Sequence, residues 1–186
     1  GLAIATVSGL ASLVVGHPSG QSLAALGDPP ATDEDRLLAW LRTSAEALGA
    51  LHARGVTHGD VRPELIWVDG DQAVVAAPAI GFGSAKSLEV AAGEPRLRPT
   101  GYEPRTPKQL PDLVDRDLFA LLRVFYRMMS GAEPWDDESR RETVRALSPV
   151  FPLRATDAWR AIFTRGLSAD RAKRFASSAD LVESLD

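Results

Sequence analysis

The sequence contains no cysteine, which excludes a disulfide framework, a thiolate metal site and a cysteine nucleophile. Basic residues are not in excess either, because 21 Lys and Arg stand against 25 Asp and Glu, giving a net charge of −4. A protein that neutralises a phosphate backbone needs such an excess. We therefore expect no nucleic-acid partner.

Long apolar runs are also missing. No segment approaches the roughly 20 apolar residues of a membrane-spanning helix, and the most apolar one, Gly9 to Val15, is far shorter and contains Ser12. The first residues lack the charged start and cleavable apolar region of a signal peptide. We expect a cytoplasmic domain, either free or the cytoplasmic domain of a membrane-anchored protein.

What is present is an ordinary globular composition. The chain has 186 residues, of which 45% are hydrophobic and 25% charged, so one domain is the default interpretation. The length is sufficient for a substantial core, yet it is small for a two-lobed enzyme. Part of a larger enzyme is therefore an alternative interpretation of this length.

The first half of the chain predicts two strands, a helix and a hairpin. Apolar and β-branched runs predict strands over 2–7 and 12–15. Thr32 with Asp35 resembles a capping box, and apolar residues at helical spacing predict a long amphipathic helix that ends near Gly55. Asp69-Gly70-Asp71 is a turn signal between strands at 66–68 and 73–76.

The second half predicts helices after a long loop. Five prolines fall between residues 84 and 112, which indicates a loop of a length that is usually functional or disordered. A wide apolar face predicts a buried helix from Asp112 to Gly131. Further helices are predicted over 136–147, after a Thr156 cap, and after a Ser177 cap. The fold class is therefore mainly α.

The segment His58-Gly59-Asp60-Val61-Arg62-Pro63-Glu64-Leu65 resembles the catalytic loop of protein kinases, His-Arg-Asp-Leu-x-x-x-Asn. Other stretches match the same family in the same order. They are Leu13-Val14-Val15 and Gly20-Gln21-Ser22-Leu23 for the hinge and the helix after it, Ile80-Gly81-Phe82-Gly83 for Asp-Phe-Gly, Gly101-Tyr102-Glu103-Pro104 for the end of the activation segment, Asp117–Leu121 and Ser130–Trp135 for the central helix, and Leu167–Ser177 for the final link. Each motif is weak alone, but their common order is specific.

The resemblance implies a protein-kinase C-lobe-like helical domain with short β-hairpins and a remnant of N-lobe strands. Residues 1–18 would be the strand remnant and hinge, and residues 19–186 the C-lobe. His58, Phe82, Asp117 and Arg174 match family residues that support the loop and the fold. Residue 105 is Arg where the family has the glutamate that pairs with the Arg174 position, which puts that ion pair in doubt unless Glu103 substitutes.

The departures from the family concern its chemistry. Leu65 stands at the metal-binding asparagine and Gly81 at the metal-binding aspartate, and neither offers an oxygen to Mg²⁺. No Gly-rich loop or Val-Ala-Ile-Lys string precedes Leu13. We therefore predict an inactive pseudokinase without metal or cofactor, in which Asp60 is vestigial and its carboxylate accepts hydrogen bonds from backbone amides.

Other conspicuous residues are more simply interpreted as structural. His52 lies on the apolar face of its helix, where a satisfied core residue is more common than a ligand. The tryptophans at 67, 135 and 159 are predicted to pack in the interior.

The loop over 94–109 supports a sharper hypothesis. Basic side chains surround Thr100 and Thr106 there, and a phosphorylated threonine would suit an arginine-bearing partner. In bacteria with Ser/Thr kinases, forkhead-associated domains fill that role, and an upstream kinase would modify the site. The residue bias resembles that of high-GC actinobacteria, where a similar pseudokinase is the cytoplasmic part of a lipid-flippase-like protein of peptidoglycan synthesis.

Three functions remain open at this point. The first is a regulatory binding scaffold that recruits a protein partner. The second is a noncanonical ATP-dependent phosphotransferase that uses Asp60 as base, since His-Gly-Asp also occurs in aminoglycoside-type phosphotransferases. The third is a purely structural domain of a larger protein.

Overall fold

The computed structural model describes residues 2–7, 10–15, 18–27, 33–76, 113–134 and 156–186, with only the backbone described for 2–7 and 10–15. Along the chain the elements are β1 (Leu2–Val7), β2 (Leu10–Val15), β3 (Gln21–Ser22), the 3₁₀ turn η1 (Leu23–Leu26), α1 (Glu34–His52), the 3₁₀ turn η2 (Pro63–Leu65), β4 (Ile66–Asp69), β5 (Gln72–Val75), α3 (Leu113–Ser130), α4 (Asp157–Gly166), the 3₁₀ turn η3 (Arg171–Lys173) and α5 (Ser178–Glu183). The predominantly helical fold class is confirmed.

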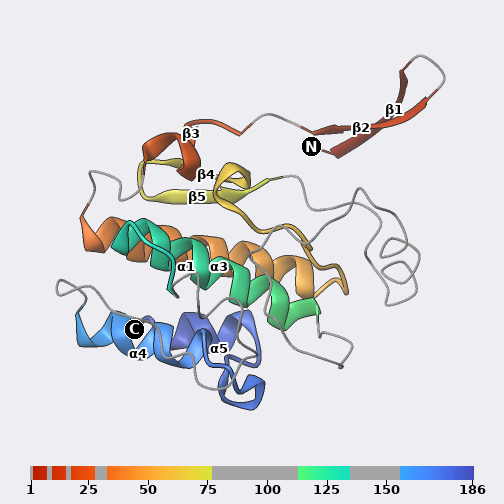
Figure 1. Ribbon diagram of the computed structural model, residues 1–186. Helices are drawn as coiled ribbons and strands as arrows, with labels where there is room; N and C mark the ends of the chain where they lie inside the picture. Colours follow the sequence, from red (N-terminus) through yellow and green to blue (C-terminus); the bar gives the residue numbers. More distant parts are fainter. Residues whose placement is uncertain (1, 8–9, 16–17, 28–32, 77–112, 135–155) are drawn as a thin grey trace.

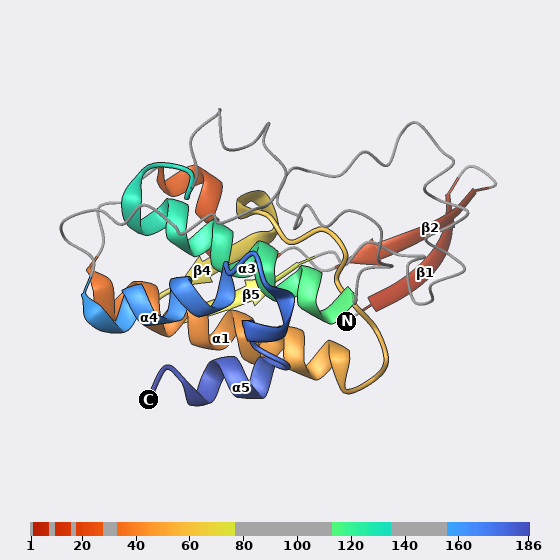
Figure 2. The same ribbon diagram turned by 60° about the horizontal axis from the view of Figure 1, so that its bottom comes forward.

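Three layers can be followed in Figure 1, with the small sheet above α1 and α3, and with α4 and α5 below them. The sheet has the order β3-β4-β5, and both of its pairings are antiparallel. A separate hairpin of β1 and β2 lies to one side in both Figure 1 and Figure 2. The helices therefore make up most of the body, and the sheet covers one side of it.

Helix α1 begins and ends close to the predicted limits, but its cap is different from the one predicted. Asp33, not Thr32, is the N-cap residue, and its Oδ1 accepts a hydrogen bond from Arg36 N at 2.8 Å. Both residue types can cap a helix, so the sequence does not decide between neighbours. The helix ends at His52, three residues before Gly55.

The predicted hairpin is confirmed as β4 and β5, and α1 holds it in place. Trp40 Nε1 donates to Gly70 O at 2.8 Å, and Ala73 N donates to Thr43 Oγ1 at 3.0 Å. These bonds satisfy polar groups at the helix–sheet boundary, where an unpaired group would be destabilising. These two bonds hold the hairpin in a fixed position against α1. They therefore also fix the position of the loop residues that lead into β4.

Strand β3 was not predicted, because its two residues were interpreted as part of the hinge and following helix. Gln21 and Ser22 pair with Val68 and Trp67. Gly20, just before the strand, has φ +82°, and a Cβ there would clash with the Val68 carbonyl. Glycine therefore permits the close approach of β3 to β4.

The C-terminal helices carry their predicted caps. Thr156 Oγ1 accepts from Trp159 N, and Ser177 Oγ accepts from Asp180 N at 3.1 Å. The predicted helix over 136–147 lies outside the described residues, as does the loop over 84–112. The buried apolar residues of α1, α3, α4, α5 and the sheet form one core cluster, which includes Leu41, Leu48, Ile66, Leu121, Leu122, Phe125, Tyr126, Phe163 and Leu181.

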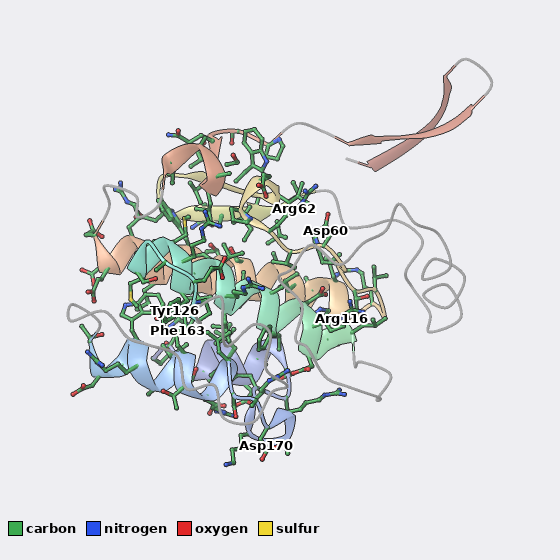
Figure 3. The ribbon with its side chains drawn as sticks, viewed as in Figure 1. Asp60, Arg62, Arg116, Tyr126, Phe163 and Asp170 are labelled. Carbon is green, nitrogen blue, oxygen red and sulfur yellow. The ribbon has the colours of Figure 1, made fainter. Side chains whose placement is uncertain are left out.

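The packing role predicted for Trp159 is confirmed, since it is 3% exposed and stacks on Phe163 with ring centroids 5.3 Å apart. Tyr126 meets the same Phe163 ring edge-on, also at 5.3 Å, which joins α3 to α4 (labelled in Figure 3). Such aromatic pairs stabilise beyond their buried area. Trp67 is partly buried, and residue 135 lies outside the described residues.

Candidate functional site

The segment from His58 to Leu65 lies between α1 and β4 and closes with η2. Pro63 stands at the start of η2, where its missing N–H is not needed. Figure 3 shows Asp60 and Arg62 on the same side of the molecule as Arg116 of α3. This segment is the candidate site, and α1, α3 and the sheet position it.

Asp117 of α3 supports the loop from below. Its carboxylate accepts three hydrogen bonds, from His58 N at 2.7 Å, from Gly59 N at 2.8 Å and from His52 Nε2 at 2.9 Å. The side chain is only 2% exposed. Hydrogen bonds to a charged acceptor are stronger than neutral ones, so one buried carboxylate ties the loop to α1 and α3.

The His58 ring is buried and has both nitrogens occupied. Nδ1 accepts from Asp60 N at 3.2 Å, and Nε2 lies 3.1 Å from Ala76 O. Burial lowers the pKa of His58 below its ordinary value of 6.5, against the opposing effects of the Ala76 carbonyl and of Asp117. A neutral ring protonated at Nε2 satisfies both contacts, and it fixes the backbone directly at Asp60.

Gly59 has a left-handed backbone with φ +75°. Its N–H donates to Asp117 in this conformation. A residue with a Cβ is strained there, whereas glycine is not. Glycine therefore removes the charged side chain that the kinase pattern carries at this position and also relaxes the loop.

His52 has the satisfied environment expected of a core histidine. Besides its contact with Asp117, its Nδ1 lies 3.3 Å from Ser178 Oγ of α5. The ring thus joins α1, α3 and α5. No group of three His, Asp or Glu side chains suited to a metal ion occurs in the described part of the chain.

Asp60 is placed differently from the prediction. Its Oδ2 lies 3.1 Å from Arg62 Nε, but the geometry is not that of a hydrogen bond. Arg62 Nε and the other oxygen, Asp60 Oδ1, therefore both stay without a hydrogen-bond partner among the described residues. The expected backbone-amide bonds to this carboxylate are therefore not seen there. Arg62, which no motif in the sequence marks as a site residue, supplies an opposite charge to Asp60.

Leu65 ends η2 and is partly buried. Its side chain has no oxygen, and Mg²⁺ requires near-octahedral oxygen coordination. The magnesium ion of kinase chemistry does not fit this position. The Asp60 carboxylate of the same segment faces the Arg62 cation.

Arg174 forms a buried ion pair that the sequence did not reveal. Its Nη1 lies 3.0 Å from Asp115 Oδ2, its Nε donates to Ser168 O at 2.7 Å, and its guanidinium lies over the Phe119 ring. Burial raises the pKa of Asp115 and lowers the pKa of Arg174, each against the pull of its partner. Asp115 precedes Asp117 by two residues, and that neighbouring acidic residue was the available signal.

The other predicted site residues lie outside the described residues. These are Gly81, Phe82, Thr100 and Thr106, together with Arg105, which replaces the family's glutamate partner of Arg174, and Glu103, its possible substitute. The structure therefore places His58, Asp60 and Leu65 in one loop, with Asp117 beneath it. Arg174 lies apart from this loop, beside Asp115 in the first turn of α3.

Comparisons with known proteins agree with the fold. No protein-family model matches the chain. It is 32% identical to the serine/threonine-protein kinase PknD of Mycobacterium tuberculosis over 162 residues, which cover 78% of this chain and 23% of that protein. It is 28% identical to the serine/threonine-protein kinase pkn2 of Myxococcus xanthus over 192 residues, covering 94% of this chain and 23% of that protein.

A solved structure, the PpkA-294 apo form, matches with a TM-score of 0.72 and 18% identity, covering all of this chain and 68% of that one. At that identity the likeness shows the fold alone. The chain spans 23% of the length of the curated relatives PknD and pkn2. Its homologues are bacterial serine/threonine protein kinases, and its fold is the helical fold of a kinase C-lobe.

Proposed function

We propose that this chain is a catalytically inactive, pseudokinase-like domain that acts as a regulatory binding scaffold. The observation that carries the proposal is Leu65, an aliphatic residue at the end of η2 where a kinase needs a metal ligand. Beneath it the supporting contacts of Asp117 and His58 are intact. The framework is kept while the chemistry is missing, which favours binding over catalysis.

The missing metal ligands matter because the transferred group develops charge during the reaction. Phosphoryl transfer relies on positioning and on cations that neutralise the developing charge of the transferred group. A bound metal contributes several kcal/mol to that stabilisation, and each 1.4 kcal/mol is about tenfold in rate. Leu65 and Gly81 cannot supply this metal, and Asp60 alone cannot replace it.

A thermal-shift titration with ATP, with and without Mg²⁺, tests this proposal. A ligand at about 100 times its Kd stabilises a folded protein by roughly 2.7 kcal/mol. We expect no magnesium-dependent stabilisation of this chain, while a kinase-active relative measured in parallel is stabilised. A clear magnesium-dependent rise in Tm for this chain contradicts the proposal.

The proposed partner is a forkhead-associated domain that reads phosphorylated Thr100 or Thr106 after an upstream Ser/Thr kinase has modified it. If the chain is the cytoplasmic domain of a membrane-anchored protein, such as a flippase-like protein of cell-wall synthesis, this binding would couple kinase signalling to cell-wall synthesis. Binding of a forkhead-associated domain is measured to phosphorylated chain, unmodified chain and Thr100→Ala/Thr106→Ala chain. Equal binding to all three, or to none, contradicts the phosphothreonine switch.

A second candidate function is a phosphotransferase with Asp60 as base. It is favoured by one observation, that Asp60 is 24% exposed and its Oδ1, though itself buried, has no hydrogen-bond donor among the described residues. Phosphate transfer to the chain itself and to a generic protein substrate tests it, with Asp60→Asn as the control. Transfer that is lost in Asp60→Asn establishes this function and overturns the scaffold proposal.

A further inference from the structure

Helix α5 packs against α1 on the side of the molecule away from the sheet, as Figures 1 and 2 show. The two helices approach closely where Gly49 of α1 meets Ser178, the first residue of α5. A Cβ at residue 49 would lie 3.1 Å from the Ser178 Cβ, which is closer than side chains normally pack. Glycine lowers helix propensity in the middle of a helix, and at this position it allows Ser178 to reach α1.

Ser178 places a buried hydroxyl next to the His52 ring. Its Oγ lies 3.3 Å from His52 Nδ1, and the serine is only 4% exposed. The other ring nitrogen, Nε2, lies 2.9 Å from Asp117 Oδ2. An ionised carboxylate can only accept a hydrogen bond, so Nε2 carries the proton and Nδ1 of the neutral ring is an acceptor. The Ser178 hydroxyl therefore donates to Nδ1.

Asp117 extends this chain of hydrogen bonds to the candidate site. Its carboxylate also accepts from the backbone amides of His58 and Gly59, at 2.7 and 2.8 Å. A hydrogen bond at one nitrogen of a histidine orients the ring, and with it the N–H at the other nitrogen. The order of Ser178, His52 and Asp117 is that of a hydrolase triad, but a serine this deeply buried does not face a substrate. The contacts instead join α5 to the loop through one continuous chain of hydrogen bonds.

We propose that Ser178 is a positioning residue for the loop from His58 to Leu65, and that α5 controls the loop through it. The serine hydroxyl holds the His52 ring in the orientation that Asp117 needs, and Asp117 in turn holds the loop backbone next to Asp60. No motif reveals this connection, because Ser178 and His52 are 126 positions apart. The connection applies to a scaffold and to a phosphotransferase alike, so its failure would leave the proposed function untouched.

Amide hydrogen exchange of the Ser178→Ala chain tests this proposal, with the parent chain measured in parallel. The loss of one buried hydrogen bond should speed exchange at the His58 and Gly59 amides about fivefold relative to the amides of α3. The matched control is Ser177→Ala, which removes the N-cap of the same helix but not the contact with His52. This control should speed exchange within α5 and leave the two loop amides unchanged.

A second variant moves α5 without removing a polar group. Gly49→Ala favours the helical state of α1, yet its new methyl group should push Ser178 away from His52 and speed exchange at the same two amides. The nitrogen resonance of His52 Nδ1, measured by NMR, gives a direct readout, since it should shift in Ser178→Ala and Gly49→Ala but not in Ser177→Ala. Unchanged loop amides in Ser178→Ala, or equal acceleration by Ser177→Ala, would overturn the proposal.

Discussion

The two sides of the loop from His58 to Leu65 differ in how completely their polar groups are satisfied. Below the loop, Asp117 accepts three hydrogen bonds and His58 has contacts at both ring nitrogens. On the other side, Asp60 Oδ1 and Arg62 Nε have no hydrogen-bond partner among the described residues, and Leu65 offers no polar atom. The support is complete, whereas the side that would meet a substrate is not.

This difference shows which properties of a kinase-like loop belong to folding and which to chemistry. A buried polar network stabilises only when its members are all paired, and the Asp117 network meets that condition. Asp60 and Arg62 are 24% and 40% exposed, so part of each side chain reaches solvent, and ion pairs in such positions contribute little to the stability of the fold. Substitutions on the two sides should therefore have very different effects on stability.

The largest effect is expected for Asp117→Ala. It leaves the amides of His58 and Gly59 and the ring of His52 without their acceptor. Each hydrogen bond to a charged group contributes about 1.5–3 kcal/mol, so the loss of all three should lower the free energy of unfolding by at least about 4–5 kcal/mol. Urea unfolding measures this. Asp186→Ala is the matched control, since it removes only an exposed contact with Arg42 and should lower stability by less than about 1 kcal/mol.

The next effect is expected at the buried pair of Asp115 and Arg174. Arg174→Ala removes the nearer and more deeply buried of the two cations that face the Asp115 carboxylate and leaves only Arg171, at 3.4 Å. Breaking the buried pair should destabilise the fold by about 3 kcal/mol. Asp115→Leu/Arg174→Met replaces both charges and should recover much of this loss. Chemical denaturation of the three proteins decides the matter. If the double variant is no more stable than Arg174→Ala, the effect comes from packing rather than from the unpaired charge.

The sequence predicted the parts of this region that depend on local chemistry. Helix starts at Thr156 and Ser177 and the hairpin turn at Asp69-Gly70-Asp71 follow from the conformations that these residues favour. The Asp115–Arg174 pair was not predictable in this way, because it joins residues 59 positions apart and depends on how α3 meets the final turn. Strand β3 was missed because two residues cannot show a period.

A third effect is the dependence of stability on pH, which is expected to come from His58 on the supporting side of the loop. Its pKa is lowered in the folded state, so the folded chain binds fewer protons than the unfolded chain between that pKa and 6.5. Stability should therefore fall as the pH drops through this window, by up to about 1.4 kcal/mol per pH unit. Urea unfolding at about pH 7.5 and about pH 5.5 tests this. His58→Gln should be less stable at the higher pH and should show a smaller change between the two; an unchanged slope would place the dependence elsewhere.

The smallest effect is expected for Asp60→Asn, although Asp60 is the residue that most resembles a catalytic group. The substitution removes a charge that faces Arg62 at 3.1 Å without a hydrogen bond, and partly exposed ion pairs contribute about 0–1 kcal/mol. The free energy of unfolding should change by less than about 1 kcal/mol. Asp117→Asn makes the same change at a buried position and should be several times more destabilising. The new side-chain NH₂ group is a donor, and it would face the N–H donors of His58 and Gly59. Equal losses in the two variants would mean that Asp60 supports the loop as Asp117 does, so that the two sides of the loop do not differ in their contribution to folding.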